Sequence, residues 1–221
     1  FRRVLFRSVS DGAAKPSPSS PRVPAGRGAE ALLFAAHTTS SCRKAAVTKL
    51  SRDMPVADLA ALICQHLADH RIEAVLTGGA VVTIYSENEY QSNDLDFIST
   101  AREKLIDGAM RALGFSRKER YYVHPDTDFF VEFPAPPLAI GNEPVRRVGE
   151  QRLATGLLKL LTPTQCVMDR LAAFYYWNDQ QAFRQAQMVA RRHSVDWNEI
   201  GRWSTAEGQT EKFAQFRKQC P

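Results

Sequence analysis

Two short segments of this sequence alternate acidic and apolar side chains, and this alternation limits what the chain can fold into. The segments are Asp94–Ile98 (Asp-Leu-Asp-Phe-Ile) and Val131–Phe133 (Val-Glu-Phe). Alternate side chains of a β-strand point to opposite faces. Asp94 and Asp96 therefore share one face, and the leucine and phenylalanine beside them point into a core. The pattern predicts half-buried strands that carry carboxylates on one face.

The shared face of Asp94 and Asp96 predicts a metal centre. Two neighbouring carboxylates repel each other and raise a pKa, and a divalent cation between them removes that cost. Mg²⁺ prefers a few carboxylates together with the phosphates of a substrate. Glu132 becomes the third carboxylate if its strand pairs with the strand of Asp94 and Asp96. Such a triad can hold two metal ions for phosphoryl-type transfer.

Gly78 and Gly79 lie between a predicted strand that ends at Thr77 and an apolar helix. Glycine lets the backbone approach a phosphate closely, and a helix N-terminus favours anions. Thr77 can add a hydroxyl donor. Each motif also has a purely structural explanation, namely a turn, a solvated acidic face, or an edge-strand charge that deters aggregation. Their order along the chain, in suitable elements, favours a nucleotide site.

Hydrophobic periodicity and turn signals predict the remaining elements. From the N-terminal side these are a helix over 56–70, strands over 73–77 and 95–98, helices over 80–85 and 101–113, and a hairpin of 120–123 with 128–133. Short strands are expected over 145–161. Helices then follow over 162–177, 179–192, 196–203 and 205–218, with capping boxes predicted at Thr162/Gln165, Asp196/Glu199 and Ser204/Glu207. The sequence predicts an α/β (α+β) fold, in which a small mixed sheet flanked by helices precedes a C-terminal helical region.

The charge of the chain is unevenly distributed. The whole sequence carries +5, with 29 basic and 24 acidic residues. Residues 1–53 contain ten of the basic and three of the acidic residues, so the remainder is slightly acidic. A basic pI therefore does not identify a nucleic-acid-binding body. We divide the chain into a disordered leader (1–53), a core (54–143), and a region of short strands and helices (144–221).

The leader is rich in Pro, Ser, Gly and Arg, a composition typical of disorder. We interpret it as non-native, because 4–8 resemble a translated sequencing adapter and Met54 directly precedes a well-patterned helix. An organellar transit peptide and a basic nucleic-acid-binding arm are the alternatives. The four cysteines, Cys42, Cys64, Cys166 and Cys220, form no Cys-x-x-Cys pair. This fits a cytoplasmic setting, and no apolar run approaches the ~20 residues of a membrane span.

The residues 76–79, 94–97 and 131–133 resemble the motifs of the nucleotidyltransferase superfamily of the DNA polymerase β type. The helical part is similar to that of AbiEii-type and related minimal nucleotidyltransferases, which include toxin–antitoxin components. A segment over 169–178 also resembles small bacterial proteins of this kind. In the AbiEii group a lysine and a later acidic residue assist nucleotide binding, and Lys159 and Asp169 hold the matching positions here. Lys159 has a second explanation as a snorkelling strand residue, and Asp169-Arg170 as an ion pair between helices.

The resemblance implies transfer of a nucleoside monophosphate from an NTP to an acceptor hydroxyl, with release of pyrophosphate. Asp94, Asp96 and Glu132 would bind Mg²⁺ or Mn²⁺, and Glu132 would help to deprotonate the acceptor. The acceptors of such families include tRNA ends, proteins and small molecules. The alternatives are a non-catalytic nucleotide-binding module, or one that works with a toxin or antitoxin partner protein.

Overall fold

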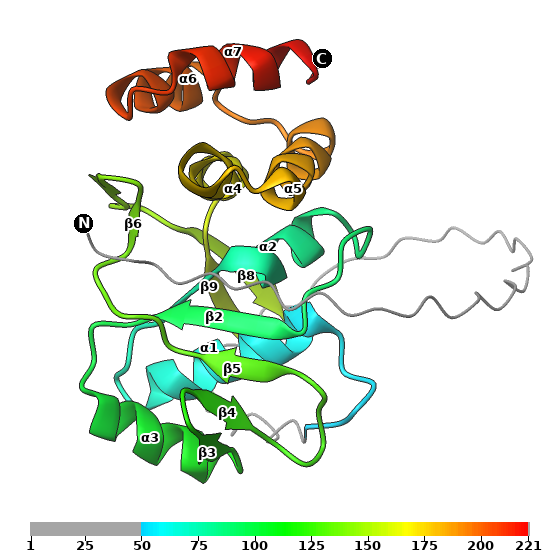
Figure 1. Cartoon of the computed structure of the whole chain (residues 1–221). Helices are drawn as coiled ribbons and strands as arrows, with labels where there is room; N and C mark the ends of the chain where they lie inside the picture. Colours follow the sequence, from blue (N-terminus) through cyan, green and yellow to red (C-terminus); the bar gives the residue numbers. More distant parts are fainter. Residues whose placement is uncertain (1–49, 221) are drawn as a thin grey trace, which may run out of the picture. The chain divides into compact units, whose positions relative to one another are not determined.

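The computed structural model of the chain describes residues 50–220. Within them, a seven-stranded sheet has the strand order β3-β4-β5-β2-β1-β9-β8. Figure 1 shows β2 and β5 side by side in this sheet. Its strands are β1 Val75–Thr77, β2 Asp94–Ile98, β3 Ser116–Lys118, β4 Tyr121–Val123, β5 Phe130–Glu132, β8 Gly149–Leu153 and β9 Gly156–Leu160.

The sheet is mixed, as the sequence predicts. β1 runs antiparallel to β2 and parallel to β9, while β2 runs parallel to β5. The strand centres are apolar and fully covered: Leu76, Leu95, Phe97 and Val131 are 0% exposed. Their burial fixes the register, because a slip of one residue would exchange this face with the acidic one.

Three helices belong to the part of the chain that forms the sheet: α1 Val56–Asp69, α2 Gly78–Tyr85 and α3 Glu103–Ala112. α1 packs against β9 and contacts α3. α2 follows β1 without a linker, as the turn at Gly78 predicts, and contacts β2. The predicted α+β fold class is therefore confirmed.

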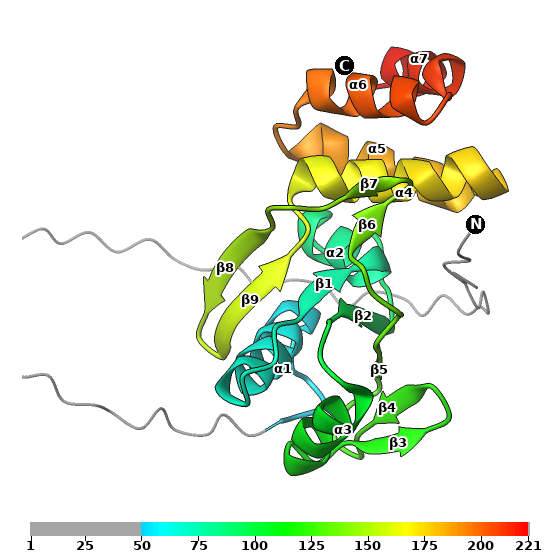
Figure 2. The ribbon, with the colours of Figure 1, turned by 90° about the vertical axis from the view of Figure 1, so that its left-hand side faces the viewer.

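The C-terminal helices are α4 Pro163–Trp177, α5 Gln180–Arg192, α6 Trp197–Ala206 and α7 Thr210–Lys218. Figures 1 and 2 both show α4 and α5 between α2 and the layer of α6 and α7. α2 contacts both α4 and α5. The helical region thus packs on the helix that begins at the glycine turn, and it is not a separate unit.

Local capping signals predicted the starts of α4 and α6. Thr162 and Gln165 form the complete capping box at the start of α4, and the Asp196 side chain accepts from the backbone N–H groups of Asn198 and Glu199. The predicted capping box of Ser204 and Glu207 is wrong. Ser204 lies buried within α6 and hydrogen-bonds the hydroxyl of Tyr175, so α6 continues past it to Ala206.

Two features of the sheet were not predicted. β3 is absent from the expected elements because Ser116–Lys118 is exposed throughout and lacks an apolar alternation. A separate two-stranded hairpin, β6 Ala139–Ile140 with β7 Glu143–Pro144, was also missed. β8 and β9 join the main sheet beside β1, so the sheet crosses the predicted boundary between residues 143 and 144.

Other sequence expectations concern composition. Cys64, Cys166 and Cys220 are free thiols and buried. In the span 50–220, none of the helices combines the length and hydropathy that crossing a membrane requires. The leader interpretation and Cys42 concern positions that lie, apart from residues 50–53, outside the described residues.

Candidate active site

The three predicted carboxylates lie on one face of the sheet. Asp96 of β2 is the register partner of Glu132 on the parallel strand β5. Asp94 lies two residues earlier on β2 and therefore points the same way. The predicted pairing of the two acidic strands is confirmed, and it places the carboxylates opposite the apolar face that packs on the core.

Asp96 is the most deeply placed of the three, with 7% of the residue exposed. Burial raises its pKa to about 7, and the charge of Glu132 adds to the rise, while the Arg170 guanidinium opposes it. Burial also raises the pKa values of Asp94 and Glu132, against the effect of Arg120. Negative charge is therefore costly here, and a bound cation would lower that cost.

The glycine turn lies directly beside Asp96. Thr77, which precedes it, is the register partner of Asp96, and its hydroxyl donates to the Asp96 carbonyl oxygen at 3.2 Å. Gly78 has φ +70°, a backbone conformation that favours glycine, and it begins α2. The structure thus brings Thr77, Gly78 and Gly79 next to the carboxylates, although the Thr77 hydroxyl proton already has an acceptor.

Gly79 is needed for a close contact with the loop before β2. A Cβ at this position would lie 2.8 Å from the Oγ of Ser92 and 3.1 Å from its Cβ. The hydroxyl of Ser92 in turn bonds both backbone groups of Asp94. The second glycine therefore allows this loop to hold Asp94 near the turn.

Lys159 is not brought to the carboxylates. Its ammonium group donates to Glu73 at 3.2 Å, and Glu73 precedes β1 at the end opposite to Gly78. The lysine is one-quarter to one-third exposed and pairs with a largely exposed acid, as a snorkelling strand residue does. The charge partner of Lys159 among the described residues is therefore Glu73, and not a member of the carboxylate set.

α4 carries Asp169 to a position from which its charge acts on Asp96. Its carboxylate raises the pKa of Asp96, so the two charges interact. Arg170 donates to Asp169 through Nε at 3.1 Å and to the Gln185 side chain on α5 at 3.4 Å. The predicted Asp169–Arg170 ion pair exists, but it lies within one helix and is buried.

Two residues near the carboxylates were missed by sequence reasoning. Arg120 lies in the turn between β3 and β4, with its Nε 3.7 Å from Glu132 Oε1. Tyr90 packs its ring over Gly79, and the charges of Arg170 and Asp94 act on the pKa of its hydroxyl, which burial raises. Arg120 could have been identified only if β3 had been predicted, because the turn between β3 and β4 carries it. Tyr90 was missed because it lies in a polar loop without periodicity.

The donor chemistry of this face fits Mg²⁺. In the part of the chain that the structure describes, no three His, Cys, Asp or Glu side chains form a ready group for a metal ion. Mg²⁺ rarely needs such a cage, because one or two carboxylates and the substrate phosphates complete its octahedron. Asp94 and Asp96 would be those carboxylates, and Glu132, which lies 3.7 Å from Arg120, would be a third oxygen donor.

Comparison with known proteins gives distant structural similarity only. No family model matches the sequence, and the search of curated proteins found no match. An antigenic nucleotidyltransferase-like protein from Paracoccidioides brasiliensis is 11% identical, with a TM-score of 0.49, covering 75% of this chain and 94% of that one. The antibiotic-resistance factor ANT(2'')-Ia is 11% identical, with a TM-score of 0.41, covering 74% of this chain and 91% of that one. The crystal structure of ANT(2'')-Ia in complex with adenylyl-2''-tobramycin is 12% identical, with a TM-score of 0.41, covering 74% of this chain and 97% of that one. At these values we transfer no activity and no residue role.

Proposed function

We propose that this chain is a Mg²⁺- or Mn²⁺-dependent nucleotidyltransferase that moves a nucleoside monophosphate from an NTP to an acceptor hydroxyl. One observation carries the proposal: Asp94, Asp96 and Glu132 share a sheet face beside the glycine turn that begins α2. Carboxylates beside a helix N-terminus suit a metal-bound triphosphate, which needs cations at the acids and N–H donors at the phosphates.

The reaction forms one bond and breaks one. The acceptor oxygen bonds to the α-phosphorus as the bond from that phosphorus to pyrophosphate breaks, and the acceptor proton leaves. Glu132 is the group that takes this proton, because it lies at the edge of the carboxylate set and is about one-quarter exposed. Bound Mg²⁺ supplies charge neutralisation for the transferred group. The α2 N-terminus holds the phosphates.

Asp169 and Arg170 act through the carboxylates and do not contact the substrate in this proposal. The Arg170 guanidinium is buried, paired with Asp169, and electrostatically coupled to Asp96. It offsets part of the negative charge at Asp96 before a cation binds. Arg170 is therefore a positioning residue in this proposal, and Asp169 orients it.

The test is transfer from an α-labelled NTP in the presence of Mg²⁺, with RNA, protein and small-molecule acceptors offered in parallel. We expect Asp96→Asn to lower transfer on the order of a hundredfold or more. Asp126→Asn is the matched control, since Asp126 is exposed in the loop before β5, and it should leave transfer unchanged. A wild-type chain that binds no NTP with Mg²⁺ and labels no acceptor would refute the proposal.

A second function is favoured by the position of Arg120. This arginine faces Glu132, so it partly neutralises the third carboxylate. A non-catalytic nucleotide-binding module, acting with a partner such as a toxin or antitoxin protein, would use the same scaffold in this way. This function would be selected over the first if the wild-type chain binds NTP without turnover and if Arg120→Ala also binds NTP without turnover.

A further inference from the structure

An exposed aromatic side chain lies on the same sheet face as the carboxylates. Phe130 is 43% exposed, although it stands on a central strand and its register partner is Asp94. Tyr121 of β4 is the register partner of Glu132 and so points the same way. The two rings contact each other, with centroids 5.9 Å apart. A pair of aromatic rings thus lies beside Glu132, the carboxylate proposed to accept the acceptor's proton.

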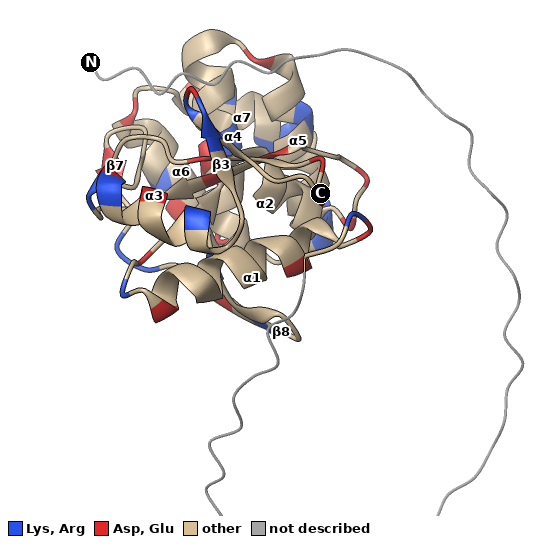
Figure 3. Ribbon diagram, turned by 90° about the horizontal axis from the view of Figure 1, so that it is seen from below, with Lys and Arg blue, Asp and Glu red and all other residues tan. Residues whose placement is uncertain are grey.

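Arg120 completes this surface. Its guanidinium carbon lies 4.7 Å from the centroid of the Tyr121 ring, and the side chain is 48% exposed. Lys118, at the end of β3, is exposed as well, and Figure 3 shows the basic positions of this strand. Aromatic rings combined with arginine and lysine are the surface that binds single-stranded nucleic acid, by base stacking and phosphate attraction.

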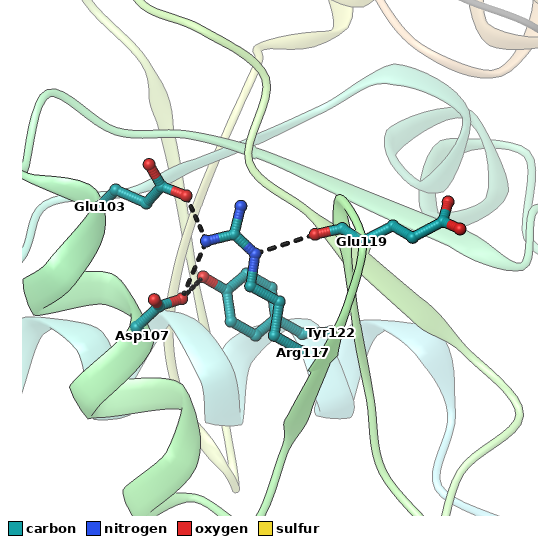
Figure 4. A network of polar contacts seen from close by, with 5 residues as sticks. All are labelled: Glu103, Asp107, Arg117, Glu119 and Tyr122. Carbon is teal, nitrogen blue, oxygen red and sulfur yellow. Dashed lines mark hydrogen bonds and ion pairs between the residues drawn. The ribbon is translucent and has the colours of Figure 1, made fainter.

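The hairpin that carries Tyr121 and Arg120 is fixed in place. Arg117 of β3 pairs with Glu103 and Asp107 of α3, and the hydroxyl of Tyr122 donates to the same Asp107. Arg117 also donates through Nε to the Glu119 carbonyl at 2.9 Å, which closes the turn before Arg120 (Figure 4). Because α3 holds the hairpin at these points, the ring of Tyr121 is presented without a large ordering cost.

We propose that Phe130, Tyr121 and Arg120 form the acceptor subsite, and that it takes the terminal nucleoside of a single nucleic-acid strand. The inference rests on the proposed function. The terminal base stacks on Phe130 and Tyr121, the preceding phosphate meets Arg120, and the terminal ribose hydroxyl turns towards Glu132. Two adjacent aromatic rings beside Arg120 and Lys118 fit a base and its phosphate, which favours a nucleic-acid acceptor over a small molecule or a protein.

The experiment compares strand ends by fluorescence anisotropy, using the full chain and a labelled single-stranded RNA 12-mer. A second 12-mer is identical except that its terminal nucleotide is abasic. Positive charge in residues 1–53 attracts both strands equally, so only the base is tested. We expect the complete end to bind roughly tenfold more tightly, because stacking of one base contributes about this factor or more.

Variants test whether the preference for the complete end depends on the aromatic rings of the proposed acceptor subsite. Phe130→Ala should remove the preference for the complete end, and Phe130→Trp should keep it, because an aromatic face is retained. The matched control is Leu105→Ala, which removes another exposed apolar side chain, 57% exposed, from helix α3 and not from the sheet face of the carboxylates; it should keep the preference. A parallel pair of DNA 12-mers identifies the sugar, and a base preference in either strand supports the subsite.

Several outcomes would overturn the inference. Equal binding of complete and abasic ends by the wild-type chain removes the stacking role, as does an unchanged preference in Phe130→Ala. Calorimetric titration with Mg²⁺ and each of the four NTPs separates the two proposals. NTP binding without any base preference at the strand end leaves the proposed function standing and rejects the subsite. A chain that binds none of the four NTPs fails the proposed function, and the acceptor role fails with it.

Discussion

At the residue scale, the Asp96 carboxylate is expected to serve metal binding and to lower the stability of the fold. A carboxylate that is almost fully buried beside Glu132 is held at a cost that a metal-binding site must bear when no cation is bound. Replacement by a neutral side chain of the same shape removes that cost together with the ligand. The same substitution should therefore abolish transfer and stabilise the fold, a trade-off typical of active sites.

The pH dependence of this trade-off is testable. The pKa of Asp96 rises from 3.8 to about 7 on folding, so the folded chain holds a proton that the unfolded chain has lost. This contribution to the free energy of unfolding is complete below pH 4 and is lost as the pH rises through 7. Without Mg²⁺, we expect the stability of Asp96→Asn relative to wild type to grow over this range, by on the order of 2 kcal/mol or about 4–8 °C. Thermal unfolding of both proteins at pH 5 and pH 8 measures the change, and a constant difference would contradict it.

Arg170 provides a second prediction, on stability alone. Its side chain is 7% exposed and pairs with Asp169, which is also largely covered. Arg170→Met leaves a buried carboxylate without this cation, and breaking a buried ion pair costs about 3–5 kcal/mol. Arg202→Met is the control, because Arg202 pairs with Glu143 at the surface, where about 1 kcal/mol or less is expected. Equal losses for the two variants in urea unfolding would show that the Arg170 pair is no stronger than a surface one.

At the scale of elements, the junction between β1 and α2 depends on space at Gly79. A methyl group there would lie 2.8 Å from Ser92 Oγ, so the loop that holds Asp94 must move. We expect Gly79→Ala to lower stability by about 1–3 kcal/mol. Ser92→Gly in the same chain should restore part of this loss, since the two side chains collide.

The control for this prediction is another helical glycine. Gly108 of α3 has open space where a Cβ would be placed, so Gly108→Ala should raise stability by about 0.5–1 kcal/mol through helix propensity. Chemical denaturation of the four proteins gives the comparison. A Gly79→Ala chain as stable as wild type would mean that the loop at Ser92 moves without cost and that the close contact does not require glycine.

The elements also show what could be predicted from sequence. Helix starts such as Thr162 and Asp196 are determined by side chains a few residues away, so local reasoning identified them. The end of α6 depends on the bond from Tyr175 to Ser204, twenty-nine residues apart, which no local pattern contains. β3 was missed for a similar reason: only its pairing with β4 makes it a strand.

The candidate site divides in the same manner. The acidic positions on β2 and β5 were predictable, because alternation determines which face a strand side chain occupies. The approach of Arg120 and Arg170 was not, since a turn and a helix far along the chain carry them. Lys159 was assigned to the nucleotide site from its position in the sequence, yet its ammonium group donates a hydrogen bond to Glu73.

At the scale of the whole molecule, helices α4 to α7 are part of the site's support. α4 carries Asp169 and Arg170 towards the sheet and packs against α6 on another side. The indole N–H of Trp203 in α6 donates to the carbonyl of Ile140, at 3.2 Å, which ties α6 to the β6–β7 hairpin. The predicted C-terminal helical region is thus joined both to the helix that follows β1 and to the β6–β7 hairpin.

The place of β9 has a consequence for synthesis on the ribosome. β1 needs β9 as its second neighbour, yet β9 ends roughly 80 residues after β1 along the chain. At 5–20 residues per second, β1 waits for roughly 4 to 16 s as an open sheet edge while the chain emerges. Unpaired edges template aggregation. The nascent chain therefore has an interval in which the strand leading into the glycine turn lacks its second neighbour, and slow codons between β1 and β9 would lengthen this interval.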